Sequence, residues 1–364
     1  MSRMPGAMPI GLENLSEVLM KRSFQCLLVV ISILCMGSSW AQQVVPDIEF
    51  DAVDPLSFPD DVYLGEAVGV ATNSDGHIFV YTRSRGVNAS LGTNRVFLRS
   101  AAQLFEFDEN GDYRREIGQG LYGFVFAHTV RVDSEDNIWV VDEGSNMVIK
   151  FNPQGQVLMT LGRKPEAIRV PTPHADYQPG SGVGVLGDNF NRPTDVAWDA
   201  EGNIFVADGY ANSRVAKFDK YGKFIKSWGS RGTEAGQFNT LHSIATDVDG
   251  NVYVGDRGNR RIQVFDNEGN FKTQFTHIGA PWAICITPGP HQYLYSSNSN
   301  GTASMDNGEI YKMELDGTVL GKFGTAGKLI GEFGSVHEID CRNENELYVG
   351  EITNWRVQKL TLRP

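Results

Sequence analysis

The chain has 364 residues, of which 41% are hydrophobic and 21% are charged, and its formal net charge is −12. This composition is typical of a soluble globular protein and argues against a disordered or collagen-like chain. The acidic charge also argues against nucleic acid or an anionic membrane surface as a partner. Forty glycines against fifteen prolines indicate many tight turns, and therefore a β-rich fold.

Residues 1–41 are predicted to form a signal peptide. Lys21 and Arg22 precede an apolar run over residues 26–36, and small residues end the segment at Ala41, as a signal-peptidase site requires. The run is shorter than the roughly 20 apolar residues of a membrane-spanning helix. We expect an exported protein, periplasmic or secreted, cleaved near Ala41, with Met20 as an alternative start of translation. An uncleaved membrane anchor is the alternative interpretation.

A sequence unit that recurs six times between residues 67 and 362 predicts the fold. Each copy begins with a short alternating strand, turns, and returns through a β-branched or aromatic strand such as IFVAD or VYVGD. A second hairpin follows. Four strands per copy, at spacings near the roughly 40 to 50 residues of known propeller repeats, specify a β-propeller blade. The unit resembles an NHL repeat, clearest in NVYVGDRGNRRIQVFDNEG.

The fold class is therefore all-β, a six-bladed β-propeller formed as a single domain by residues 42–364. Because the last copy has only three strands, we expect the segment around Val44 to Asp51 to supply the fourth strand and close the ring. Insertions at about 86–101, 163–188 and 297–308 are surface loops, of which the first two rim the ring and either shape a pocket or vary freely.

Cys285 and Cys341 remain after processing, and we expect two buried free thiols rather than one bridge.

Three histidines occupy one repeat position in alternate blades. When the first strands of the six copies are aligned, this position holds Val68, His128, Thr194, His242, Trp282 and His337. Alternate blades of a six-bladed ring are 120° apart, and the first strand of each blade lines the central channel. The three imidazoles are therefore predicted to converge. A set of three histidines leaves a fourth tetrahedral position open, which is typical of catalytic zinc.

The end of the second strand supplies further candidates. This repeat position holds Arg83, Glu143, Gly209 and Arg257, and Tyr210 comes one residue later. Because the second strand runs antiparallel to the first, these side chains are predicted to lie on the histidine face. Two guanidinium groups beside a metal suit a substrate carboxylate. A phenol near zinc and arginine is expected to have a pKa below its usual value, which makes Tyr210 a candidate base.

This combination resembles the peptidyl-α-hydroxyglycine α-amidating lyases, the zinc enzymes that form the second half of peptide C-terminal amidation. The resemblance runs from about Gly65 to Leu362 and is carried by segments such as FAHTVRVD, DGYANSR and LHSIATDVDGNVYVGDR. It implies three sets of site residues: a zinc site at His128, His242 and His337; a catalytic tyrosine and two active-site arginines at Tyr210, Arg83 and Arg257; and a structural calcium held by two main-chain carbonyls and a carboxylate at Val70, Val130 and Glu338. Glu338 stands where animal members have aspartate.

The resemblance implies that a peptidyl- or N-acyl-α-hydroxyglycine is cleaved at its C–N bond to an amide and glyoxylate. The expected partner is thus a small molecule or peptide with a carboxylate, bound by a monomer. The alternative from another class is a non-catalytic NHL propeller that binds a protein or glycan on its top face, with a purely structural metal. A propeller lactonase that uses calcium needs carboxylates in the channel, where this chain has imidazoles.

Overall fold

The computed structural model describes residues 45–84, 87–90, 96–99, 102–164, 187–299 and 308–363. The predicted signal peptide lies outside the described residues, as do most of the insertion at 163–188 and parts of the other two insertions. Within the described ranges, no helix is long and apolar enough to cross a membrane. Residues Val45–Pro364 form one compact unit.

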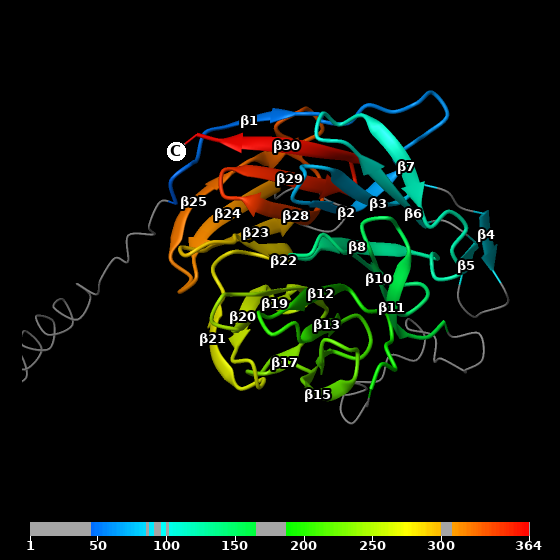
Figure 1. Ribbon diagram of the computed structural model, residues 1–364. Coiled ribbons are helices and arrows are strands. Elements are labelled where there is room, and N and C mark those ends of the chain that lie inside the picture. The colour runs from blue at the N-terminus through cyan, green and yellow to red at the C-terminus, as the bar shows by residue number, and fades with distance from the viewer. Residues whose placement is uncertain are drawn as a thin grey trace, which may run out of the picture. The chain divides into compact units, whose positions relative to one another are not determined.

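Six four-stranded antiparallel sheets form the blades of a propeller (Figure 1). The strands of the first three blades follow each other in chain order from the channel outwards. Blade 1 consists of β2 (Glu66–Thr72), β3 (Ile78–Arg83), β6 (Ala102–Phe107) and β7 (Tyr113–Ile117); blade 2 of β8 (Ala127–Val132), β9 (Ile138–Asp142), β10 (Met147–Phe151) and β11 (Val157–Gly162); and blade 3 of β12 (Asp195–Trp198), β13 (Ile204–Asp208), β14 (Arg214–Phe218) and β15 (Phe224–Trp228).

The remaining blades repeat this order, with one exchange at the end. Blade 4 consists of β18 (Leu241–Thr246), β19 (Val252–Asp256), β20 (Arg261–Phe265) and β21 (Phe271–Phe275); blade 5 of β22 (Pro281–Ile286), β23 (Tyr293–Ser299), β24 (Gly308–Glu314) and β25 (Val319–Phe323); and blade 6 of β28 (Val336–Asn343), β29 (Glu346–Glu351), β30 (Arg356–Leu362) and β1 (Phe50–Val53). The predicted six-bladed fold is confirmed.

The described part of the chain holds three further small sheets and one short helix outside the blades. The hairpin of β4 and β5 lies within the first predicted insertion. The pairs are β4 (Val87–Ser90) with β5 (Val96–Arg99), β16 (Ser230–Arg231) with β17 (Gln237–Phe238), and β26 (Thr325–Ala326) with β27 (Glu332–Phe333), and the 3₁₀ helix η2 spans Arg257–Asn259.

The first and last strands of the propeller pair with each other and close the ring. In β1, Phe50 lies opposite Leu362 of β30, and the two strands are antiparallel. The segment before β1 also reaches blade 5, where the Ile48 N–H donates a 2.7 Å hydrogen bond to the carbonyl oxygen of Lys322. The strand predicted around residues 44–51 is therefore present, although it starts at Phe50. The closure gives blade 6 its fourth, outermost strand and pairs the outer edge of β30.

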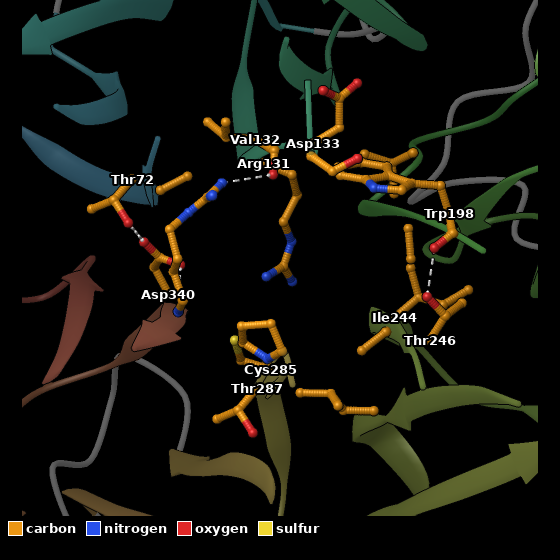
Figure 2. Close-up of a pocket in the computed structure, with 18 of the residues that line it drawn as sticks. Thr72, Arg131, Val132, Asp133, Trp198, Ile244, Thr246, Cys285, Thr287 and Asp340 are labelled. Atoms are coloured by element: carbon orange, nitrogen blue, oxygen red, sulfur yellow. Dashed lines mark hydrogen bonds between the residues drawn. The ribbon is translucent and has the colours of Figure 1, made fainter. Parts of the chain in front are cut away.

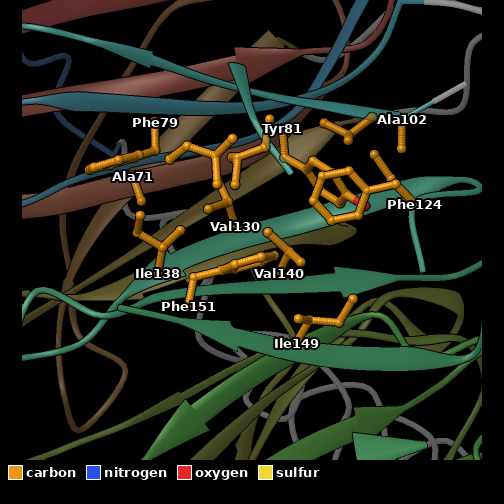
Figure 3. Close-up of a cluster of buried hydrophobic side chains, with 14 of the residues drawn as sticks. Ala71, Phe79, Tyr81, Ala102, Phe124, Val130, Ile138, Val140, Ile149 and Phe151 are labelled. Carbon is orange, nitrogen blue, oxygen red and sulfur yellow. The ribbon is translucent and has the colours of Figure 1, made fainter. Parts of the chain in front are cut away.

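The apolar core lies between neighbouring blades rather than within one of them. Figure 3 shows such a cluster between blades 1 and 2, with Phe79 and Tyr81 on one side and Val140 and Phe151 on the other. Alternate residues of each strand point to opposite faces of its sheet, so each blade contributes to two clusters. The Tyr81 hydroxyl donates a 2.9 Å hydrogen bond to Asp142, which satisfies a polar group within this core.

The two remaining cysteines form a disulfide bond, and the expectation of free thiols was wrong. Cys285 lies on β22 and Cys341 on β28, with their Cα atoms 6.0 Å apart. These innermost strands of blades 5 and 6 contact each other along the channel. Cysteines 56 positions apart in the sequence therefore come within bonding distance, which is a consequence of blade packing that cysteine counting does not reveal.

Candidate metal centre and active site

A buried acidic residue at the end of each second strand fixes the loop that leads into a histidine-bearing strand. In blades 2, 4 and 6 this residue is Asp142, Asp256 or Glu351, and each is fully buried. Their carboxylates accept backbone hydrogen bonds from these loops: Val125 N at 2.8 Å, Asn239 N at 2.7 Å and Gly334 N at 2.8 Å. The acidic ends of the IWVVD, VYVGD and LYVGE segments thus set where β8, β18 and β28 begin.

The structure brings the three histidines together. One ring nitrogen from each of His128, His242 and His337 lies within 4.8 Å of the others, and all three side chains are buried. Among the described residues, this is the only group of three or more histidine, cysteine or acidic side chains arranged to hold a metal ion. The convergence follows from the ring, because the innermost strands of the six blades contact their neighbours around one channel.

Two backbone carbonyls orient the imidazoles. His242 Nδ1 donates to the Trp282 carbonyl at 2.6 Å, and His337 Nδ1 donates to the Val68 carbonyl at 2.6 Å. Val68 and Trp282 occupy the same repeat position as the histidines, in the next blade around the ring. With Nδ1 protonated, Nε2 of each ring is left as a lone-pair donor. The sequence alignment of the six copies placed Val68 and Trp282 at this position but predicted no role for them.

The histidine cluster fits a metal ion. His242 Nε2 is buried and has no hydrogen-bond partner among the described residues. An unpartnered buried imidazole nitrogen costs free energy unless a ligand or metal satisfies it. The pKa of each histidine lies well below its usual range because burial disfavours the imidazolium; Arg257 adds repulsion at all three, and Arg83 adds it at His128 and His337. The rings are therefore neutral at pH 7, which is the form that coordinates metals.

Tyr210 lies beside this cluster and is half-buried. Its hydroxyl oxygen is 3.4 Å from His128 Nε2. Burial raises the pKa of Tyr210, while the positive charge of Arg257 opposes that shift. The expectation of a pKa below the usual value is therefore not met by the protein's own groups: the cost of burying a phenolate exceeds the stabilisation that the nearby guanidinium groups provide.

Arg257 points its guanidinium group into the site. The group lies 4.1 Å from the centre of the Trp282 ring and 5.6 Å from that of Tyr210. Arg257 opens η2, where its backbone N–H donates to the Thr240 carbonyl at 3.1 Å. No carboxylate of a described residue forms an ion pair with Arg257. Its positive charge is thus held by aromatic faces and is available to an anionic ligand.

Arg83 is more firmly engaged within the protein. Its Nε donates to the carbonyl oxygen of Ala127 at 2.8 Å, directly before His128, and its Nη1 pairs with Glu66 at 3.1 Å. The guanidinium also lies 3.8 Å from the centre of the Phe126 ring. Arg83 therefore holds the start of β8 in place and contributes positive charge near the histidines.

Arg192 is a neighbour of the site that the sequence interpretation missed. Its guanidinium lies 4.5 Å from the centre of the Tyr210 ring, and it forms an ion pair with Glu143. The Tyr210 N–H donates to the Arg192 carbonyl at 3.3 Å. A signal was present, because Arg192 lies two residues before Thr194, which is the blade 3 residue at the histidine position.

The predicted calcium ligands lie next to the histidine positions along the innermost strands. Val70 and Val130 are buried on the innermost strands β2 and β8, and Glu338 is buried on β28 next to His337. The Glu338 carboxylate already has a cationic partner, because Arg131 Nη2 lies 3.0 Å from its Oε1. Beyond Arg131, the channel widens into a cavity of about 340 Å³, into which Arg131 projects (Figure 2). This cavity is separate from the histidine cluster.

Comparison with known proteins agrees with this architecture. Residues 190–345 match a family model described as a 6-bladed beta-propeller. The chain is 34% identical over 311 residues to peptidyl-glycine alpha-amidating monooxygenase A of Xenopus laevis, covering 79% of this chain and 31% of that protein. It is 32% identical over 242 residues to a probable peptidyl-alpha-hydroxyglycine alpha-amidating lyase of Caenorhabditis elegans, covering 61% of this chain and 64% of that protein.

A solved gluconolactonase from Xanthomonas campestris has a similar fold, with a TM-score of 0.55 and 14% identity over 88% of this chain and 95% of that one. At this identity the likeness shows the fold alone. The chain spans about a third of the length of the amidating monooxygenases that it matches. The resemblance drawn from the sequence is confirmed: this chain is a homologue of the peptidyl-α-hydroxyglycine α-amidating lyases, built as a six-bladed propeller.

Proposed function

We propose that this protein is a zinc-dependent lyase that cleaves a peptidyl- or N-acyl-α-hydroxyglycine to an amide and glyoxylate. The observation that carries the proposal is the meeting of three neutral histidines with a half-buried tyrosine and an arginine that has no carboxylate partner among the described residues. Three imidazoles bind a catalytic metal, a tyrosine transfers a proton, and an arginine holds a carboxylate. Homologues named as amidating lyases support the same reaction class.

His128, His242 and His337 would hold the zinc ion. The hydrogen bonds from His242 and His337 to backbone carbonyls fix their ring orientation, as is common for metal-binding histidines. Bound there, zinc would supply a Lewis acid for a substrate oxygen and positive charge beside the Tyr210 phenol.

Tyr210 is the proposed base. The reacting carbon of the substrate carries a hydroxyl group and the amide nitrogen. As the tyrosinate, Tyr210 removes the hydroxyl proton through Oη, the oxygen becomes the aldehyde oxygen of glyoxylate, and the C–N bond breaks with its electron pair going to nitrogen. The nitrogen then takes the proton back from Tyr210, so the tyrosine ends the cycle in its starting form.

Arg257 is the proposed partner of the substrate carboxylate. Its guanidinium can bind a carboxylate through two hydrogen bonds while the ring of Trp282 lies 4.1 Å away on one side. The positive charges of Arg257 and Arg83 oppose the rise that burial causes in the pKa of Tyr210, and so they stabilise the tyrosinate that acts as the base. Because Arg83 already binds the Ala127 carbonyl and Glu66, we assign it this electrostatic role rather than direct binding of the substrate carboxylate.

Glyoxylate release from α-hydroxyhippurate tests the proposal. Purified protein with zinc is expected to release glyoxylate, and Tyr210→Phe is expected to reduce kcat by about 100-fold or more, the size of a general-base contribution. Zinc content and the melting temperature of the variant should stay at the wild-type values. Tyr221→Phe is the matched control, because Tyr221 is 78% exposed and its loss should leave turnover unchanged.

The outcomes separate the proposed enzyme from a binding propeller. Zinc without glyoxylate release, over a panel of acylated hydroxyglycines, would favour the non-catalytic alternative. Normal turnover by Tyr210→Phe would remove the assigned role of the tyrosine but not the lyase activity.

We also propose that the protein is exported and cleaved near Ala41. The disulfide between Cys285 and Cys341 supports this, because disulfides persist in oxidising compartments. N-terminal sequencing of protein recovered from the periplasm or the medium tests the cleavage position; a mature protein that retains residues 20–41 would contradict it.

A further inference from the structure

The central channel contains an arginine where the sequence resemblance implies a calcium ion. Arg131 projects from β8 into the middle of the ring (Figure 2). Its guanidinium binds Asp195 through two hydrogen bonds, from Nε at 3.1 Å and from Nη2 at 2.7 Å. The same Nη2 lies 3.0 Å from Oε1 of Glu338, which is the carboxylate implied as a calcium ligand.

The guanidinium connects the innermost strands of four blades. It belongs to blade 2, Asp195 to blade 3, and Glu338 to blade 6. It also donates to two backbone carbonyls: that of Ile284 in blade 5 at 3.3 Å, and that of Ile339 in blade 6 at 3.5 Å. A structural cation on the axis of a ring would join the blades in the same way, because it would bind carboxylates and carbonyls that come from separate blades.

The carboxylate oxygens around Arg131 have few free lone pairs. Each oxygen of Asp195 accepts one bond from Arg131 and one backbone N–H, from Val196 at 2.8 Å or Ile244 at 2.9 Å. Glu338 accepts from the Ile339 N–H at 3.3 Å and from the Thr129 hydroxyl. Calcium needs six to eight oxygen ligands at roughly 2.3–2.6 Å, and it would be repelled by the guanidinium that shares these carboxylates. The residues present do not fit the ion.

We propose that Arg131 takes the place of the structural calcium, so that this propeller is held together at its axis by a side chain and binds no calcium there. The proposal does not depend on lyase activity.

Calcium content and thermal stability test this proposal. All samples contain a slight excess of zinc, so that changes at the histidines do not contribute. Wild-type protein passed through calcium-free buffer is expected to contain less than about 0.1 equivalent of calcium by elemental analysis, and millimolar calcium chloride should leave its Tm unchanged. In Arg131→Ser, two buried carboxylates lose their partner, and the Tm should fall by about 5–8 °C. Calcium should then restore much of that loss.

Arg342→Ser is the matched control. Arg342 lines the same cavity, but its Nη2 donates to the Val132 carbonyl at 3.4 Å, away from Asp195 and Glu338. Its Tm should not respond to calcium. The proposal is overturned if wild-type protein retains about one equivalent of calcium, if calcium raises the wild-type Tm as much as that of Arg131→Ser, or if Arg131→Ser without calcium is as stable as wild type. If Arg131→Ser does not fold, the wild-type measurements and Arg131→Lys, with an expected smaller loss of Tm, still decide the question.

Discussion

Removal of the disulfide between blades 5 and 6 should destabilise the propeller by a measurable amount. Cys285 and Cys341 are 56 positions apart. The chain-entropy relation for a loop of that length gives about 14 cal/mol/K, or about 4 kcal/mol at 25 °C. A folded unit of about 320 residues has an unfolding entropy of about 0.7 kcal/mol/K. The double variant Cys285→Ala with Cys341→Ala is therefore expected to melt about 6 °C below the oxidised wild type.

Differential scanning calorimetry of the double variant and the wild type measures this difference. Cys341 is fully buried, so a reductant reaches the bond mainly after unfolding, and the variant is the cleaner comparison. Dithiothreitol should lower the Tm of the wild type towards that of the variant and should not affect the variant itself. A difference in Tm of less than about 1 °C between wild type and variant, both without reductant, would refute the reasoning. It would mean that the loop is already closed in the unfolded chain or that the bond strains the blades.

Three further outcomes are expected. His242→Ala should lower bound zinc from about one equivalent to below about 0.1 in elemental analysis, since two remaining imidazoles bind zinc weakly, and full retention of zinc would contradict the assigned ligand set. Arg257→Gln should raise KM for α-hydroxyhippurate by about 10- to 100-fold, the value of a hydrogen bond to a charged group, whereas an unchanged KM would place the substrate carboxylate elsewhere. Deletion of residues 45–53 should prevent cooperative unfolding followed by circular dichroism, because blade 6 loses β1, while a chain that starts at residue 45 should melt like the mature protein.

The sequence predicted the histidine cluster because that prediction needs only the repeat. Once the six first strands are aligned, His128, His242 and His337 fall on one position in alternate blades. The geometry of the ring then brings their side chains together in the channel. The closing strand follows from the same count, because a last copy with three strands requires a fourth. Properties shared by every copy can thus be read from one chain.

Contacts between blades outside the shared repeat positions were not predictable in this way. Arg131 of blade 2 binds Asp195 of blade 3 and Glu338 of blade 6, and no local pattern marks such a set. The Cys285–Cys341 bond has the same origin. The pKa of Tyr210 was misjudged because its direction depends on a balance between burial and nearby charge, and sequence spacing shows the charges but not the depth of burial.

The pairing of Phe50 with Leu362 has a consequence for the order in which the protein matures. The first strand to be synthesised, β1, cannot pair until the last one, β30, has been made, and more than 300 residues separate them in the sequence. Contacts so distant in the chain form slowly, so an open, incomplete ring persists until synthesis has finished. The third imidazole of the metal cluster, at position 337, also arrives in the final stretch. The polypeptide therefore acquires its closed shape and its capacity to capture metal late and nearly together, after the whole chain is available.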